Sequence, residues 1–410
     1  MKRALAAVIP ERLERPLRSS AFRRLALGKS ISFLGDWVMV AVLVGWVYES
    51  TSSVAQVALL MVIRLVPPIV GGGLAASLVD RLPRLKVLVG SEIACAATVA
   101  GALVGVTIGS RALVFGFVGL CGLVAMVSTV AGNALIPMTV EPGELPAANA
   151  IHSVGQEAAM ALGAVTGGVT LAVGGPAAGL AANLVSYGFA VLLYARIRVA
   201  AEPHEKTRRT RGGLVEGFRY VVGQRTLAVV VGGFAVVTLA AGLVNATLPK
   251  FTAGLGLGAS GYAWALSALA VGMIAGEALT GAIAERIEPR WLAAGLAAMG
   301  SLFFAFAWSG SAVVALLLFA AFGAANGFAE VVMMTAIHEL ADPAYQGRVF
   351  GIGSTIWRTT MLGAVALAPV VDAIASPAQA ITVAAGFLLV GAVLVHVTLR
   401  PLPQPTPAAA

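Results

Sequence analysis

The sequence predicts an all-α membrane protein with twelve transmembrane helices, arranged as two pseudo-symmetric bundles of six helices. Three observations predict this fold class. First, 59% of the 410 residues are hydrophobic and only 11% are charged, which is too little polar surface to cover a chain of this length in water. Second, the apolar residues form twelve long runs. Third, charged motifs recur at equivalent places in the first and the second six runs.

The twelve apolar runs divide into two sets of six, separated by a polar gap. Each run is close to the roughly 20 residues that a helix needs to cross the hydrocarbon core of a bilayer. No alternating apolar pattern indicates a β-barrel. The expected spans are 27–48, 54–79, 87–109, 112–136, 148–173, 176–195, 226–248, 259–284, 291–310, 312–336, 347–371 and 377–399.

This pattern predicts an N-terminal six-helix bundle over residues 1–195, a cytoplasmic linker with an interfacial helix over 196–225, and a C-terminal six-helix bundle over 226–410. In the linker, "GLVEGFRYVVGQR" predicts a short helix on the inner leaflet of the membrane. We expect its apolar side chains on one face: Leu214, Phe218, Val221 and Val222. The alternative is an ordinary N-terminal extension of the seventh span.

Lysine and arginine decide the expected orientation. If both termini are cytoplasmic, 23 of the 27 basic residues fall on the inner side, whereas only Arg111 and Lys250 fall on the outer side. The sequence therefore predicts a multi-pass protein of the inner (plasma) membrane with cytoplasmic N- and C-termini and no visible cleavable signal peptide. This topology accounts for the net charge of +8, so a nucleic-acid partner is not expected. The two cysteines lie in apolar runs and predict neither a disulfide nor a metal site.

Internal similarity indicates a duplication of a six-helix unit. "ASLVDRLPRLKVL" at 76–88 returns in weaker form as "GAIAERIEPRWLA" at 281–293, and "LGAV" occurs at both 162–165 and 362–365. The shifts of about 200 residues relate equivalent points of the two halves. A parallel repeat of this kind predicts a substrate path between the bundles, near the middle of the membrane.

With these motifs, the chain resembles the major facilitator superfamily over essentially its whole length. That family has Gly-x-Leu-Ala-Asp-Arg and a basic cluster between spans 2 and 3, where this chain has Ala76 in place of the glycine, then Asp80 and Arg81. The second copy keeps the glycine and has Glu285 and Arg286. "SFLGDW", "GLVEGFRYV" and "QGRVFGI" are similar to the drug and siderophore exporter branch, with its macrolide-efflux-like and enterobactin-exporter-like proteins.

The charged loop motifs are candidate gates. A carboxylate at the cytoplasmic end of a span can face a helix N-terminus and an arginine when the bundles close on that side. We expect such a latch to favour the outward-facing state, as the resemblance also implies. The gating candidates are Asp80, Arg81, Arg84, Glu285 and Arg286. The alternative is that the basic residues only enforce topology, which is the interpretation we favour for Lys86.

Ionisable residues inside spans are costly and are therefore candidate functional groups. Glu92 lies near the start of its span, and we expect it to reach headgroup water. The other six fall on spans that line the cavity in the resembled fold. The proton-coupling candidates are Glu157, Glu330, Asp36 and Glu277, and the substrate-binding candidates are Arg64, Arg358 and Trp357. The alternative is that these charges form fixed salt bridges that only hold helices together.

The resemblance leaves the coupling mechanism open. "LGAVTGG" in span 5 is similar to the antiporter signature Gly-Pro-x-x-Gly-Gly, but Ala164 replaces the proline. Span 4 contains no arginine, although drug–proton antiporters usually have one there.

The function expected from the sequence is secondary export of amphipathic small molecules by alternating access, coupled to proton antiport, by a monomer in the lipid bilayer. Alternatives are export of a siderophore or other anionic metabolite, a lysophospholipid or lipid flippase, and a non-transporting membrane adaptor. No nucleophile–base pattern, phosphate-binding loop or metal-ligand cluster is present, so neither an enzyme nor a cofactor is expected.

Overall fold

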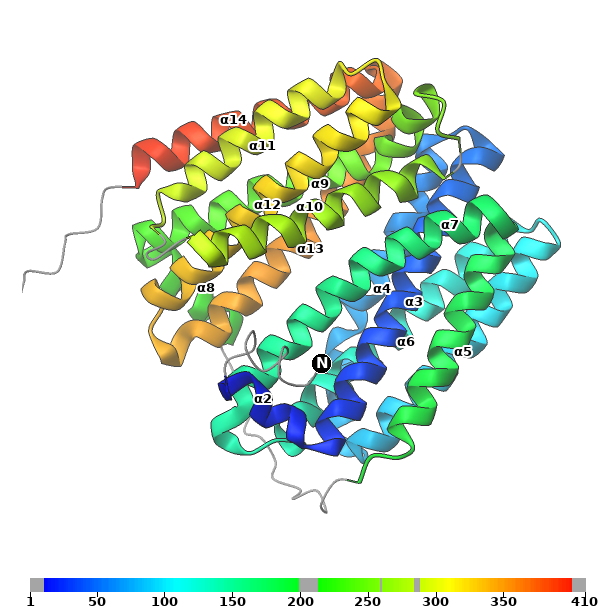
Figure 1. Cartoon of the computed structure of the whole chain (residues 1–410), viewed down its shortest axis with the longest axis vertical. Coiled ribbons are helices and arrows are strands. Elements are labelled where there is room, and N and C mark those ends of the chain that lie inside the picture. Colours follow the sequence, from blue (N-terminus) through cyan, green and yellow to red (C-terminus); the bar gives the residue numbers. More distant parts are fainter. Residues whose placement is uncertain (1–10, 199–212, 259, 284–287, 400–410) are drawn as a thin grey trace, which may run out of the picture. The chain divides into compact units, whose positions relative to one another are not determined.

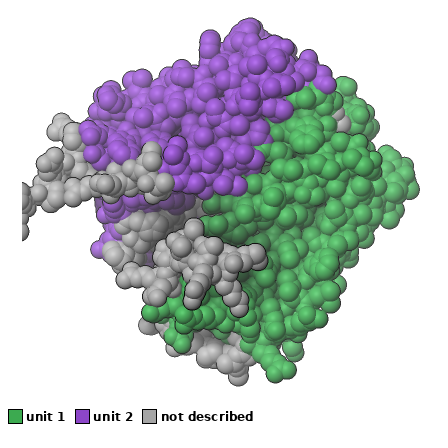
Figure 2. Space-filling view, in the orientation of Figure 1, with its two compact units in different colours: residues 1–208, 257–267 green, residues 209–256, 268–410 purple. Residues whose placement is uncertain are grey.

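The computed structural model describes residues 11–198, 213–258, 260–283 and 288–399. Within these ranges the secondary structure is helical and contains no strand. The chain divides into two compact units, which Figure 2 distinguishes by colour. Unit 1 comprises residues 1–208 and 257–267, and unit 2 comprises residues 209–256 and 268–410.

Unit 1 is built from long helices with short connections (Figure 1). Ser19, Ser53 and Ser110 cap three of these helices, because each side chain accepts a hydrogen bond from a backbone N–H of the first turn. The helices are α2 (Glu11–Arg18), α3 (Ser20–Thr51), α4 (Val54–Arg81), α5 (Arg84–Thr107), α6 (Arg111–Leu135) and α7 (Leu145–Tyr194), with 3-10 turns at Ile136–Met138 and Pro142–Glu144.

Helix α7 is broken within its 50 residues. Gly175 has φ 67° and ψ −170°, a backbone conformation that is readily available only to glycine, and Pro176 follows it. The break therefore divides α7 into two arms at the boundary that the sequence predicts between residues 173 and 176.

Helix α3 packs along α7, and α5 packs against α6 and α7. A buried apolar cluster that includes Phe22, Leu88, Leu135 and Tyr194 fills the space between these helices at one end of the unit. The Tyr194 ring occupies the space where a side chain at Gly28 would project, so the missing side chain allows the ring to pack on α3. The two cysteines, Cys95 and Cys121, are buried and free.

Unit 2 repeats this pattern of packing. Helix α9 packs along α13 and α14, and α11 packs against α12 and α14. Residues 261–267 at the start of α10 are grouped with unit 1. The helices are α8 (Gly213–Gly223), α9 (Arg225–Gly254), α10 (Gly261–Ile283), α11 (Trp291–Ala307), α12 (Ala312–Leu340), α13 (Pro343–Ile374) and α14 (Pro377–Thr398).

The two "LGAV" segments lie at equivalent helix contacts. In unit 1, a Cβ atom at Gly163 of α7 would lie 2.7 Å from the Cβ atom of Trp37 on α3. In unit 2, a Cβ atom at Gly242 of α9 would lie 2.7 Å from the Cβ atom of Ala364 on α13. Small residues thus allow close helix approach at both copies of the repeat.

Helices α10 and α12 approach each other closely, backbone to backbone. Added Cβ atoms at Gly272 and Gly276 of α10 would overlap the carbonyl oxygens of Ala320 and Ala324 on α12. In return, Gly323 and Gly327 of α12 face the carbonyl oxygens of Leu269 and Met273 on α10. Both segments read Gly-x-x-x-Gly, which places two small residues on one side of each helix.

Ten of the described helices are long and apolar enough to cross a membrane, and α11 is a shorter apolar helix of 17 residues. Counted by unbroken helices, the described chain thus contains fewer spanning candidates than the twelve expected. The difference arises because α7 contains two of the expected spans on either side of Gly175, and because α11 is short.

Helix α8 is anchored to the start of α13. The Tyr220 and Tyr345 rings stack with centroids 4.2 Å apart, and Arg348 forms an ion pair with Glu216 at 3.2 Å. Phe218 and Val222 are exposed, whereas Val221 is buried. These three side chains share one side of the helix at 3.6 residues per turn, so the interfacial helix stays a prediction, and the side chain of Leu214 lies outside the described residues.

Candidate functional site

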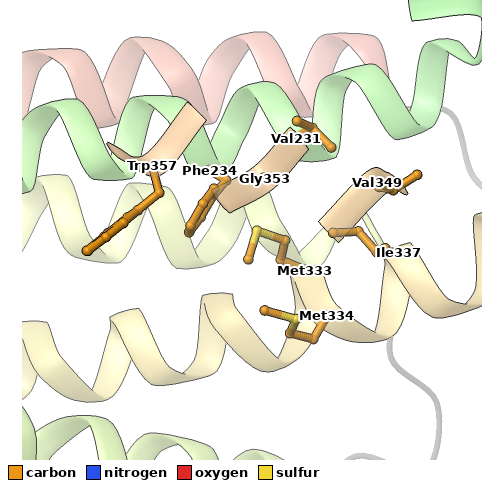
Figure 3. A pocket seen from close by; sticks show the side chains of 8 residues that line it. All are labelled: Val231, Phe234, Met333, Met334, Ile337, Val349, Gly353 and Trp357. Atoms are coloured by element: carbon orange, nitrogen blue, oxygen red, sulfur yellow. The ribbon is translucent and has the colours of Figure 1, made fainter. Parts of the chain in front are cut away.

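A cavity of about 300 Å³ lies within unit 2, between α9, α12 and α13. Figure 3 shows that Trp357 and Phe234 project from their helices toward the side where α12 places Met333 and Met334. The lining is formed by Val231, Phe234, Met333, Met334, Ile337, Val349, Gly353 and Trp357.

The chemistry of this apolar cavity favours a hydrophobic group. Among the described residues, the side chains that line it are aliphatic, aromatic or thioether groups, and they offer no charge that would compensate a buried one. The volume is at the lower end of the range for small-molecule sites, which is typically ~300–1,000 Å³. Met333 and Met334 have flexible, polarisable side chains that adapt to different apolar shapes. The exposed indole of Trp357 offers a planar surface for stacking.

Two candidate carboxylates lie at the same level of the α10–α12 contact. The residues that face each other across this contact give the register of the two helices. The difference in residue number is 54 for Leu269–Gly323 and Met273–Gly327, and 48 for Gly272–Ala320 and Gly276–Ala324. Glu277 is therefore level with residues 325–331 of α12, a stretch that includes Glu330.

The same spacings place both carboxylates toward the contact between the helices. Glu277 follows Met273 by four residues and Glu330 follows Gly327 by three, and residues with these spacings share one side of a helix. Both side chains are partly buried. The helix register therefore brings two partly buried carboxylate side chains to the same level of this contact.

Asp36 of α3 has polar partners on α7. Tyr187 donates a hydrogen bond from its hydroxyl to Oδ1 of Asp36 at 2.5 Å. Asn183, one turn earlier on α7, is fully buried and lies beside Gly35. Asp36 thus lies inside unit 1, bound to a neutral hydroxyl donor.

Arg64 of α4 lies over an aromatic ring of the same unit. Its guanidinium carbon is 5.8 Å from the centroid of the Trp37 ring, which is a cation–π distance. Arg64 also lies within electrostatic range of Asp36. The structure therefore brings Asp36, Trp37 and Arg64 together.

Glu92 differs from its prediction. Its side chain is fully buried and does not reach headgroup water, so the prediction of an interfacial position is wrong. Lys29, one of the 23 basic residues that the expected orientation places on the inner side, lies 3.9 Å from it and is 5% exposed. The polar spacing of Lys29, Ser32 and Asp36 along α3 is the signal that could have shown this buried cluster.

The other predicted site residues occupy separate places. Glu157 is partly buried in α7, and Arg358 is partly buried in α13 next to Trp357. Asp80 and Arg81 are exposed at the end of α4, whereas Arg84 packs on the end of α6 and approaches Met138 Sδ at 3.3 Å. Glu285 and Arg286 lie outside the described residues. The gating roles of these residues stay predictions.

Comparison with known proteins identifies one matching family. A model of the Major Facilitator Superfamily matches residues 25–357 and 230–410. No curated protein matches the sequence significantly.

Solved transporters share the fold. The chain is similar to a bacterial homologue of the human lysosomal transporter Spinster in an inward-facing, unoccupied conformation, with a TM-score of 0.71, 15% identity, and coverage of 94% of this chain and 97% of that chain. The chain is also similar to an auto-inhibited POT family peptide transporter, with a TM-score of 0.69 and 12% identity. The match covers 95% of this chain and 99% of that chain. For a D-xylose–proton symporter the TM-score is 0.69 and the identity is 14%, and the match covers 93% of this chain and 98% of that chain. At these identities the likeness concerns the fold.

Proposed function

Because the chain belongs to the Major Facilitator Superfamily, we propose that it is a secondary exporter of amphipathic small molecules that works by alternating access and proton antiport. Membership of this family indicates a multi-pass membrane transporter rather than an enzyme. The proposal goes further in three respects, which are the substrate class, the direction of transport and the coupling ion. It places the protein in the drug and siderophore exporter branch that the span 1 and span 11 motifs resemble.

The proposed topology has twelve crossings. The two arms of α7 would each cross the membrane, as would the short helix α11. Both termini and α8 would lie on the cytoplasmic side of the inner membrane, because nearly all lysine and arginine residues then fall on that side. The N-terminal bundle (1–195), the linker (196–225) and the C-terminal bundle (226–410) would act as a monomer.

The apolar cavity in unit 2 is the observation that supports the substrate class. It accommodates an aromatic or branched aliphatic group, and a polar or cationic part of the same molecule would stay in the wet path outside it. An anionic metabolite would need a cationic lining, and the described side chains of this cavity are apolar. The cavity therefore favours an amphipathic substrate over a siderophore.

The role of the cavity in substrate binding is tested by a substitution that fills it. Gly353 lines the cavity, and a Cβ atom built there has no neighbour within 4 Å among the described residues, so Gly353→Phe directs a new side chain from open space. We expect the KM for a lipophilic cationic dye such as ethidium to rise about tenfold, which corresponds to ~1.4 kcal/mol of lost binding. Gly363→Phe on the same helix is the matched control, since its added side chain also has open space but lies outside the lining. Equal KM values for the two variants would exclude this cavity as the binding site.

The carboxylates at the α10–α12 contact support proton coupling. A single proton held between Glu277 and Glu330 would be released when a cationic substrate or a change of solvent access favours the ionised pair. Asp36 and Glu157 are further candidates in unit 1. The charged residues Asp80, Arg81 and Arg84, with Glu285 and Arg286, would hold the cytoplasmic side closed in the outward-facing state.

Proton coupling is tested in proteoliposomes with an imposed pH gradient. We expect Glu330→Gln to abolish dye accumulation driven by the gradient, a loss of tenfold or more, while exchange of labelled for unlabelled dye continues. Glu49→Gln, at an exposed carboxylate near the end of α3, is the control and should accumulate dye as the wild type does. Dye movement that responds neither to the gradient nor to Glu330→Gln would rule out proton antiport at this site.

A further inference from the structure

Unit 1 contains a buried polar cluster that the proposed transport mechanism does not use. It comprises Lys29 and Ser32 of α3, Glu92 of α5 and Ser128 of α6, which we call the Lys29 cluster. Lys29 Nζ donates to Ser128 Oγ at 3.0 Å, and Ser128 Oγ donates to Glu92 Oε1 at 2.6 Å. Ser32 Oγ also donates to Glu92 Oε1, at 3.3 Å. Hydroxyl groups therefore connect the ammonium to the carboxylate.

The cluster is enclosed by the helices that contribute to it. Glu92 is fully buried, and Ser32 and Ser128 are each 4% exposed. The alkyl chain of Lys29 lies against Gly132 of α6, where a Cβ atom would be 3.0 Å from the lysine Cδ atom. This glycine lets the lysine side chain extend between α3 and α6 to reach Ser128.

The two oxygens of Glu92 differ in their surroundings. Oε1 accepts from two serines and faces the ammonium, whereas Oε2 is buried and has no hydrogen-bond partner among the described residues. A buried carboxylate oxygen without a donor is costly, and binding a proton removes its charge. The ion pair is also indirect, since the ammonium is 3.9 Å from Oε1 and bonds to Ser128 instead.

The cluster continues along α3 toward Asp36. Lys29, Ser32 and Asp36 are spaced by three and four residues and therefore share one side of the helix. This side faces Glu92 at one level and Tyr187 at the next. A row of polar groups thus extends through the interior of unit 1.

We propose that Glu92 is a proton-exchanging carboxylate and that Lys29 is its fixed counter-ion. In the exchange, an O–H bond of a hydronium ion breaks and leaves water, an O–H bond forms at Oε2 of Glu92, and the neutral ion pair becomes a carboxylic acid beside an ammonium. No other bond forms or breaks, and the net charge of the cluster increases by one. The neutral acid holds Lys29 less strongly, so protonation loosens α3 from α5 and α6.

Titratable side chains of three helices lie near Glu92, namely Lys29 and Asp36 of α3, Cys95 of α5 and Tyr194 of α7. Cys121 of α6 and Tyr187 of α7 lie next to these groups, and His152 of α7 lies near Lys29. Of these groups, Lys29 belongs to the cluster itself, where it donates to Ser128.

Infrared difference spectroscopy tests the protonation itself. The full-length protein in lipid vesicles is stepped between acidic and alkaline pH, and the C=O stretch of buried carboxylic acids is recorded. We expect a pH-dependent band that disappears in Glu92→Gln and persists in Glu49→Gln. Superimposable spectra of the wild type and Glu92→Gln would overturn the proposal, because Glu92 would then keep one protonation state throughout and act only as a structural pin.

A transport measurement tests whether proton exchange at Glu92 couples transport to the pH gradient. This consequence rests on the proposed function. We expect Glu92→Gln to lose gradient-driven dye accumulation by tenfold or more while dye exchange continues. The double variant Lys29→Met/Glu92→Gln, in which the cluster is neutral, should fold and remain uncoupled. Recovery of gradient-driven accumulation in the double variant would overturn the proposal. If the wild type ignores the gradient but shows the Glu92 band, antiport is refuted and proton exchange at Glu92 stands.

Discussion

Replacing Gly276 by alanine is expected to destabilise the purified protein by about 2 kcal/mol or more, because the new methyl group overlaps the backbone of α12. The added Cβ atom would meet the carbonyl oxygen of Ala324, which cannot rotate away as a flexible side chain can. Relief requires the two helices to separate along the Gly-x-x-x-Gly contact. Separation also moves Glu277 relative to Glu330, so gradient-driven transport should fall together with stability.

The measurement is thermal unfolding followed by intrinsic tryptophan fluorescence. Trp291 of α11 reports on this region, since its ring stacks with that of Phe328 on α12 at 6.4 Å. Gly386→Ala on α14 is the matched control, because an added Cβ atom there has no neighbour within 4 Å. That variant should unfold at the wild-type temperature or slightly above it, since alanine favours the helix. Equal unfolding temperatures for the two variants would contradict the close backbone contact.

Lys29→Met is expected to destabilise unit 1 by about 3–5 kcal/mol, the usual cost of removing one partner from a buried ion pair. Methionine keeps most of the volume of the side chain but removes the cation, which leaves the carboxylate of Glu92 buried with only serine donors. The added Glu92→Gln substitution should restore most of the lost stability, because no uncompensated charge then remains.

The two cysteines provide the measurement for this variant. Cys95 and Cys121 are both buried and free in unit 1, so a thiol-reactive fluorescent dye reports the opening of this unit on heating. Lys86→Met on α5 is the control, since Lys86 is exposed and its removal should leave the reaction temperature unchanged. If Lys29→Met and Lys86→Met behave alike, Lys29 is not a buried counter-ion.

Hydropathy predicted the helices well because the bilayer requires long apolar segments with internally satisfied backbone groups. The expected boundary between residues 173 and 176 coincides with the break at Gly175, since glycine followed by proline interrupts the regular helix. Helix ends were less predictable. Helix α5 begins at Arg84, so Glu92 lies two turns inside it and not near an edge.

Pairings between distant residues were the part that sequence reasoning missed. A lysine near the end of a span, such as Lys29, is explained by membrane orientation alone, and its partner Glu92 is on another helix. The glycine pairs of α10 and α12 were visible as Gly-x-x-x-Gly in the sequence, but the register that brings Glu277 level with Glu330 needs both helices in place. The cavity lining could not be selected, since its residues resemble every other apolar side chain of the spans.

The break at Gly175 also decides where an epitope tag can be inserted for topology mapping. The two arms of α7 meet without an intervening loop, so an insertion there would push apart residues that the helices require. Gly109 and Gly310 lie in exposed connections between other helices, and neither position has a neighbour within 4 Å of an added Cβ atom. Tags at these two connections should be tolerated, and antibody access from the outside of intact cells would then report on which side of the membrane they lie.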